Sequence, residues 1–120
     1  MPAVRYIVED VDRALEFYVG RLGFRVLEDW GPVVTVARED VELWLSGPES
    51  SAAREYPGGV RPHGGGWKSF VLVLDELDPL LAELVEAGVP VRDETLESPA
   101  GRWIVVEDPD GNPVELFEPR

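Results

Sequence analysis

The chain has 120 residues, 44% of them hydrophobic and 29% charged, a composition typical of a single folded domain rather than a disordered segment. It contains no cysteine, which excludes disulfides, thiolate nucleophiles and cysteine-bound zinc. Asp and Glu number 24 against 11 Lys and Arg, and the resulting net charge of −13 disfavours nucleic acid as a partner and favours cationic molecules.

The first half of the chain predicts one strand, one helix and three further strands. An apolar run at 4–8 precedes a segment, 11–22, in which apolar residues recur at intervals of three and four, the spacing of an amphipathic helix. Asp10 is a suitable N-cap for this helix, and Gly23 a suitable end. Three short strands bounded by turn-forming residues are predicted at 24–30, 33–37 and 41–46.

The second half repeats the same order of elements. An apolar run at 70–74 is followed by a helix that opens at Asp75 to Asp78 and ends at Gly88. Pro79 lies in the first turn of this helix, where its missing N–H does no harm. The strands that complete the second half are predicted at 89–92, 103–107 and 114–118.

The repeat also appears in the residues themselves, because Val-Glu-Leu-Trp at 41–44 corresponds to Val-Glu-Leu-Phe at 114–117. One strand–helix–three-strand unit cannot cover both faces of its sheet, whereas two copies can pair around a concave cleft. The sequence therefore predicts an α+β fold with two βαβββ modules that form curved mixed sheets around a cleft. The modules span about 1–47 and about 67–120, and the Gly-, Pro- and Ser-rich segment 48–66 is a linker or lid.

Several motifs together resemble those of a known family. They are Val8-Glu9-Asp10-Val11-Asp12, Glu16-Phe17-Tyr18, Leu22-Gly23-Phe24 and the terminal Asp108-Pro109-Asp110-Gly111-Asn112-Pro113-Val114-Glu115-Leu116. In this order they resemble the vicinal oxygen chelate superfamily, which includes glyoxalases, bleomycin-resistance proteins and dioxygenases. The resemblance implies paired modules, a ligand cleft inside the curved sheet and a homodimer. In the family's enzymes it also implies a divalent metal held by the first and last strands of each module.

The resemblance places the last-strand metal positions at Glu42 and Glu115, both of which are carboxylates. It places the first-strand positions at Ala3 and at Lys68 or Ser69, none of which is a customary ligand. Because two carboxylates without an imidazole hold a divalent ion weakly, we expect no metal cofactor. The alternative is a Zn, Ni, Mn or Fe site on Glu42 and Glu115.

Aromatic side chains accompany both of these carboxylates. Trp44 and Phe117 lie two residues after Glu42 and Glu115, so strand alternation places each on the same face as its acid. An aromatic ring beside an acid suits a flat or positively charged ligand. Ordinary core or interface packing is the competing explanation for each tryptophan. The ligand-binding candidates are Glu42, Trp44, His63, Trp67, Trp103, Glu115 and Phe117.

His63 is the only histidine and lies in the glycine-rich loop, from which it could act as a general base, as a third metal ligand, or simply remain exposed. No catalytic residue is assigned. The predicted function is metal-independent binding of an aromatic or cationic small molecule, similar to bleomycin-resistance proteins that sequester an antibiotic. The alternatives are a metal-dependent lyase, isomerase or dioxygenase, and a structural dimer module without a ligand. Without a leader-like or membrane-spanning run, the protein is expected in the cytoplasm with no membrane partner.

Overall fold

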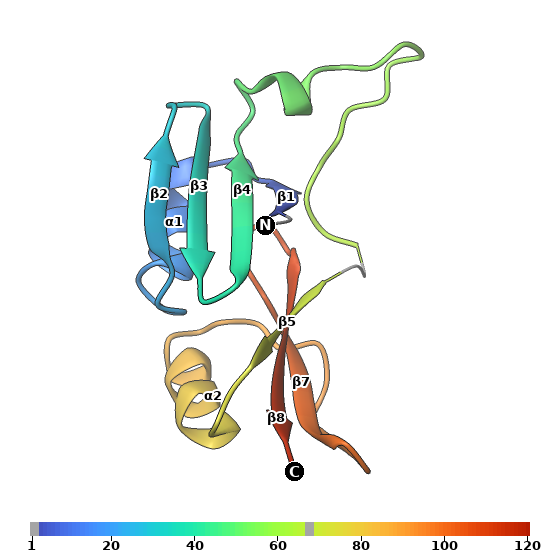
Figure 1. Cartoon of the computed structure of the whole chain (residues 1–120). Coiled ribbons are helices and arrows are strands. Elements are labelled where there is room, and N and C mark those ends of the chain that lie inside the picture. Colours follow the sequence, from blue (N-terminus) through green and yellow to red (C-terminus); the bar gives the residue numbers. More distant parts are fainter. Residues whose placement is uncertain (1–2, 67–68) are drawn as a thin grey trace. The chain divides into compact units, whose positions relative to one another are not determined.

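The computed structural model describes residues 3–66 and 69–120, and the chain divides into two compact units, Met1–Gly65 and Gly66–Arg120. Each unit contains one α-helix and one four-stranded mixed sheet (Figure 1). The predicted α+β class and the two βαβββ modules are therefore confirmed. Within the described ranges, none of the helices has the length and apolar character needed to cross a membrane.

The first unit has the element order that the sequence predicted. Its elements are β1 (Ala3–Ile7), α1 (Val11–Tyr18), β2 (Arg25–Asp29), β3 (Val33–Arg38), β4 (Val41–Ser46) and a short 3₁₀ turn, η1 (Ser51–Ala53). The strands lie in the order β1-β4-β3-β2, with β1 parallel to β4 and the other pairs antiparallel. Parallel pairing of β1 and β4 requires a crossover connection, and α1 lies within it.

The second unit has the same topology. Its elements are β5 (Phe70–Val73), α2 (Leu77–Glu86), β6 (Leu96–Ser98), β7 (Gly101–Glu107) and β8 (Pro113–Pro119), in the sheet order β5-β8-β7-β6. The strand predicted at 89–92 is wrong, because Val91 forms only an isolated bridge with Val106. Pro90 has no N–H to donate to a ladder, and the fourth strand of the sheet forms further along, at β6.

A glycine in a left-handed conformation follows each helix, directly after α2 and after a further turn in α1. The Asp10 side chain accepts a hydrogen bond from the Arg13 N–H, which confirms the predicted N-cap of α1. Regular α1 stops at Tyr18, earlier than predicted, and turn residues lead to Gly23 at φ 75°. At the end of α2, Gly88 has φ 82°, and its N–H bonds the Val85 carbonyl.

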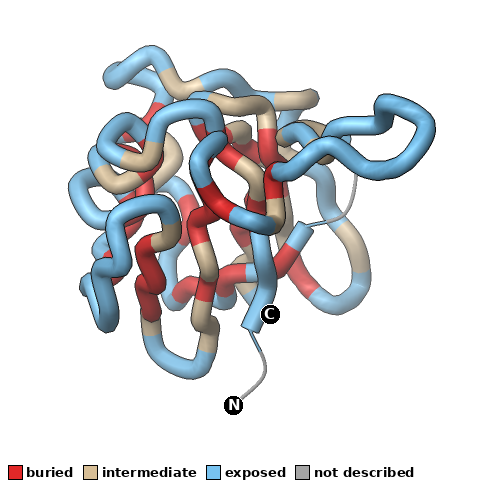
Figure 2. The backbone as a smooth tube through the Cα atoms, turned by 90° about the horizontal axis from the view of Figure 1, so that it is seen from above, coloured by how far each residue is buried: buried red, intermediate tan, exposed pale blue. Residues whose placement is uncertain are grey.

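Burial alternates along β5 and over much of β4 and β7, whereas in β3 it is continuous from Val34 to Ala37 (Figure 2). The largest buried apolar side chains of each sheet share one face. In the first unit this face includes the fully buried Leu43 and Leu45 of β4, and α1 packs against β3 and β4. In the second unit it includes Leu116 of β8, and α2 packs against that strand. Alternation therefore directs Glu42, Trp44, Glu115 and Phe117 to the opposite faces.

The terminal motif that carries the family resemblance forms the turn between β7 and β8. Asp108 is 2% exposed, and its Oδ1 accepts hydrogen bonds from the backbone N–H groups of Asp110 and Asn112. Its Oδ2 accepts from the Asn112 side-chain amide at 2.9 Å. Gly111, at φ 79°, donates its N–H to the Asp108 carbonyl. The motif thus fixes the register in which β8 presents Glu115 and Phe117.

Candidate functional site

The first candidate surface is the face of the first sheet opposite its buried core. In the strand register, Ala3 pairs with Glu42 and Arg5 pairs with Trp44, while Trp44 also pairs with Thr35 of β3. Residues that pair directly across neighbouring strands project to the same side of a sheet. These five residues therefore share one surface, called here the Glu42 face.

Trp44 lies at the centre of a cluster on this face. Its indole Nε1 donates a hydrogen bond of 2.7 Å to Oε2 of Glu42. The ring of Trp30 meets it edge to face, with centroids 6.3 Å apart and planes at 81°. The guanidinium carbon of Arg5 lies over the Trp44 ring, 5.1 Å from its centroid. We call these four residues the Trp44 cluster.

The Trp44 cluster combines an accessible aromatic surface with fixed polar groups. Trp44 is half-buried, whereas Trp30 is 58% exposed and offers a ring surface to solvent. The indole N–H of Trp44 is already satisfied by Glu42, so the Trp44 ring is held in one orientation. A planar molecule can stack on such rings while its edge meets a carboxylate or a guanidinium.

The sequence predicted that Glu42 and Trp44 lie together, and the structure confirms this placement. It did not single out Arg5, nor the contact between Trp30 and Trp44. A signal for Arg5 was present, because Arg5 follows Ala3 by two residues on the same strand and so shares its face. The contact with Trp30 depends on the turn that begins after β2, which strand alternation does not determine.

The second candidate surface is the corresponding face of the second sheet. Val73, Phe117, Trp103 and Leu96 form one continuous row of directly paired residues across all four strands. The next row contains Val71, Glu115 and Val105. We call this surface the Glu115 face. Exposed hydrocarbon dominates it, since the exposed fractions of Val71, Val73 and Leu96 are 43%, 57% and 38%.

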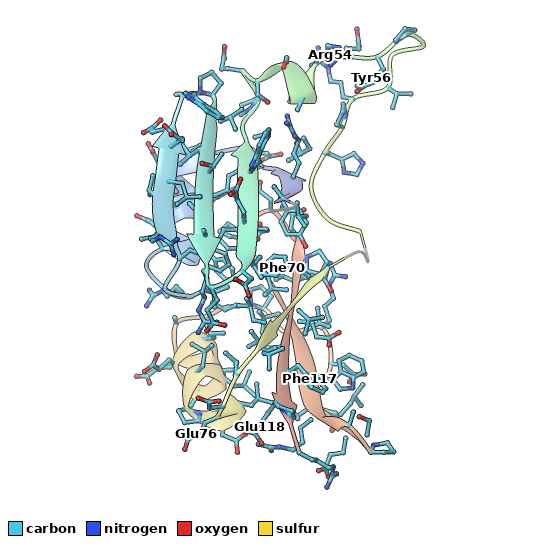
Figure 3. The ribbon with its side chains drawn as sticks, in the orientation of Figure 1. Arg54, Tyr56, Phe70, Glu76, Phe117 and Glu118 are labelled. Atoms are coloured by element: carbon cyan, nitrogen blue, oxygen red, sulfur yellow. The ribbon has the colours of Figure 1, made fainter. Side chains whose placement is uncertain are left out.

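Two predicted site residues, Trp103 and Phe117, are brought together on the Glu115 face as a direct cross-strand pair. Figure 3 labels Phe117 on β8, the strand that also carries Glu115. Burial raises the pKa of the Glu115 carboxyl above its ordinary value of 4.5. Val71 and Val105 on either side of it supply hydrocarbon in place of hydrogen-bond donors. When protonated, this carboxyl can donate a hydrogen bond to a ligand oxygen.

The side chains beside the two glutamates do not suit a divalent metal. Ala3 pairs with Glu42, and the residue that pairs with Glu115 is Val71. The family resemblance had placed this second position at Lys68, which lies outside the described residues, or at Ser69, which precedes β5. A hydrocarbon side chain is thus the direct first-strand neighbour of each carboxylate. Across 3–66 and 69–120, no three His, Asp or Glu side chains cluster closely enough to hold a metal.

The loop after β4 carries His63, one of the predicted site residues. His63 is exposed, and its Nδ1 lies 2.8 Å from the carbonyl of the adjacent Gly64, a contact that does not bring the imidazole to Glu42 or Trp44. Arg54 lies over the ring of Tyr56, 4.6 Å from its centroid, in the same loop (Figure 3). Trp67, another predicted ligand-binding residue, lies outside the described residues.

Comparison with known proteins identifies relatives along nearly the whole chain. The family model of the Glyoxalase/Bleomycin resistance protein/Dioxygenase superfamily matches residues 1–116. By sequence, the chain is 28% identical to the protein YwkD of Bacillus subtilis (strain 168), over 96% of this chain and 93% of that protein. The resemblance drawn from the motifs is therefore confirmed.

Two solved structures illustrate the likeness in fold. A superfamily member from Sphaerobacter thermophilus DSM 20745 is 28% identical with a TM-score of 0.77, over 98% of this chain and 96% of that one. TnmS3, an antibiotic binding protein from Streptomyces sp. CB03234, is 29% identical with a TM-score of 0.72, over 100% of this chain and 97% of that one.

Proposed function

The chain belongs to the Glyoxalase/Bleomycin resistance protein/Dioxygenase superfamily, and we propose that it binds a small planar aromatic molecule at the Trp44 cluster without a metal ion. The observation that carries this proposal is the pair of tryptophans on the Glu42 face, with centroids 6.3 Å apart and Trp30 58% exposed. An exposed aromatic surface beside a fixed indole favours a stacked ligand.

Sequestration, rather than turnover, is the role that these residues suit. The direct first-strand neighbours of the two glutamates are hydrocarbon side chains, which supply no second ligand for a metal ion. The likeness to TnmS3, an antibiotic binding protein, supports a binding role and an antibiotic-like ligand. Aromatic contacts and one or two polar anchors are sufficient for a protein that only holds its ligand.

Of the two ligand types expected from the sequence, the aromatic one is better supported at this surface. A cationic ligand would stack on Trp44 through cation–π attraction, but Arg5 already lies over that ring. Two positive charges on one ring repel each other, whereas a neutral or negatively charged aromatic does not meet this penalty.

The test uses 2-naphthamide, a neutral planar probe, with chelator present throughout. The indole N–H signals of the four tryptophans are resolved by ¹H–¹⁵N NMR and assigned with single Trp→Phe variants. We expect the signals of Trp30 and Trp44 to shift on titration, and Trp44→Leu to weaken binding about tenfold or more. Trp103→Leu, on the Glu115 face, is the matched control and leaves the affinity within about twofold.

Two results contradict the proposal. The first is that 2-naphthamide shifts neither the Trp30 nor the Trp44 signal. The second is that binding appears only after a divalent metal is added. Shifts confined to Trp103 would assign ligand binding to the Glu115 face and would also reject the Trp44 cluster as the site.

A further inference from the structure

We propose that Arg5 makes the Trp44 cluster selective for aromatic acids, that is, planar aromatic molecules that bear a carboxylate or another anionic oxygen. This inference rests on the proposed function and adds the charge of the ligand to it. The juxtaposition that carries it is a guanidinium held over an indole on the Glu42 face, 5.1 Å from the ring centroid.

Arg5 is available for a ligand. It is exposed on β1, an edge strand of the first sheet. None of the ion pairs found among the described residues includes Arg5, although other arginines form them with nearby carboxylates. The chain as a whole has a net charge of −13 and repels anions. An arginine that forms no such ion pair and lies on an aromatic surface attracts an anion locally.

The contact with Trp44 orients this charge without consuming its hydrogen bonds. The guanidinium carbon lies 5.1 Å from the Trp44 ring centroid, and among the described residues no hydrogen bond to a protein acceptor engages the Arg5 N–H groups. Those N–H groups form a fork that matches the two oxygens of a carboxylate. A ligand ring can then contact the exposed Trp30 while its carboxylate meets Arg5.

Among the described residues, the carboxylates nearest in the register form no ion pair with Arg5. Glu42 belongs to the neighbouring row, and its Oε2 is engaged by the Trp44 indole at 2.7 Å. Glu28 lies two strands beyond Trp44, across Thr35, on β2. The other arginine on this face, Arg25, lies on β2 at the opposite edge of the sheet. Arg5 is therefore the cation that belongs to the Trp44 cluster itself.

The experiment compares three probes of one shape and different charge: 2-naphthoate, 2-naphthamide and 2-naphthylmethylammonium. Their affinities are measured by calorimetry with chelator present, at about 0.15 M salt so that the overall negative charge of the protein is screened. We expect 2-naphthoate to bind about tenfold more tightly than 2-naphthamide, and the ammonium probe to bind most weakly.

Three variants separate the role of Arg5 from general effects. Arg5→Gln removes the preference for the acid, so that 2-naphthoate and 2-naphthamide bind this variant with affinities within about twofold of each other. Arg5→Lys keeps the charge without the fork and restores only part of the preference. Arg21→Gln, which makes the same chemical change at an exposed turn residue after α1, keeps the full preference.

The outcomes distinguish this inference from the proposed function. If 2-naphthoate and 2-naphthamide bind equally, or if Arg5→Gln keeps the preference, the inference is overturned while aromatic binding stands. If the ammonium probe binds most tightly, the charge assignment is reversed and the inference is likewise overturned. If none of the three probes binds, the proposed function fails, and the inference fails with it.

Discussion

The indole N–H of Trp44 donates to the carboxylate of Glu42, two residues earlier on the same strand, at 2.7 Å. In the second unit the corresponding pair is Phe117 and Glu115, and a phenyl ring has no N–H to donate. Burial among hydrocarbon then raises the pKa of Glu115. One substitution within the repeat thus gives its two glutamates different surroundings. The Glu42 face combines aromatic and charged groups, whereas the Glu115 face is mainly apolar.

The first prediction concerns the hydrogen bond between Trp44 and Glu42. Glu42→Ala should lower the free energy of unfolding by about 1 kcal/mol, because it removes one charge-assisted hydrogen bond on a half-buried surface. It should also move the Trp44 indole proton signal upfield in the ¹H–¹⁵N spectrum. Glu49→Ala, at an exposed position in the following loop, is the control and leaves that signal in place. An unmoved signal in Glu42→Ala would mean that the hydrogen bond does not persist in solution.

The second prediction is a pH dependence at Glu115. The pKa of this carboxyl is raised in the folded protein, so the folded state binds its proton more tightly than the unfolded state does. Ionised Glu115 therefore destabilises the fold as the pH rises from its ordinary pKa of 4.5 through the higher folded value. Glu115→Gln should consequently be more stable than the wild type at neutral pH, and this advantage should disappear on acidification.

The check on Glu115 is chemical unfolding of the wild type and Glu115→Gln at several pH values between neutrality and the acidic range. Glu83→Gln, an exposed carboxyl on α2, serves as the matched control and should track the wild type throughout. The prediction is contradicted if the stability advantage of Glu115→Gln over the wild type grows as the pH falls. It is also contradicted if the two proteins have the same free energy of unfolding at every pH.

The fold could be predicted from the sequence because its signals are local and occur twice. The pattern at 41–46 gave the bounds of β4 residue for residue, since the aliphatic residues Val41, Leu43 and Leu45 alternate with other residues between two turns. The prediction of a strand at 89–92 was wrong because this apolar segment pairs with β7 only at one isolated bridge, between Val91 and Val106. The actual strand, β6, contains no β-branched residue, and it exists because it pairs with β7.

The site was only partly predictable, for a related reason. Alternation along one strand places Trp44 with Glu42, and this was seen from the sequence. Which residues meet across strands depends on register, which is set by tertiary pairing. The cross-strand neighbours Arg5 and Trp44, and Trp103 and Phe117, therefore required the structure. The prediction for His63 rested on its residue type and its place in the glycine-rich loop, and its Nδ1 contacts the adjacent backbone.

The third prediction concerns the first turn of helix α2, which is capped by a side chain from strand β8. Oε2 of Glu118, on β8, accepts a hydrogen bond of 2.7 Å from the Leu77 N–H, and Oε1 lies 3.2 Å from Nη2 of Arg102 (Figure 3). The N-cap residue Glu76 makes no side-chain capping bond. Glu118→Ala should therefore lower the free energy of unfolding by about 1 to 2 kcal/mol, measured in urea.

Glu76→Ala provides the matched control, since it deletes the same side chain at the same helix end (Figure 3). Its effect should stay below about 0.5 kcal/mol. Equal losses in the two variants would show that general acidity near the helix N-terminus, and not the specific bond from Glu118, stabilises α2.

The fourth prediction concerns the β7–β8 turn. Asp108 is 2% exposed and accepts three hydrogen bonds from the turn. Asp108→Ala should lower the free energy of unfolding by about 2 kcal/mol or more, because it leaves buried N–H groups unsatisfied. Pro109→Ala, exposed in the same turn, should cost less than about 1 kcal/mol. A mild effect of Asp108→Ala would mean that water replaces the lost carboxylate.

The last prediction addresses the metal chemistry of the family directly. Demetallated protein is titrated by calorimetry with zinc, nickel, manganese and iron(II), and we expect affinities weaker than micromolar. The physical reason is that Ala3 and Val71 supply no donor beside Glu42 and Glu115. Ala3→His is the informative variant, since it places an imidazole next to Glu42 and should increase the affinity for zinc. Micromolar or tighter binding by the wild type that is lost in the double variant Glu42→Ala, Glu115→Ala would instead establish a metal site with unusual ligands and restore the enzyme alternative.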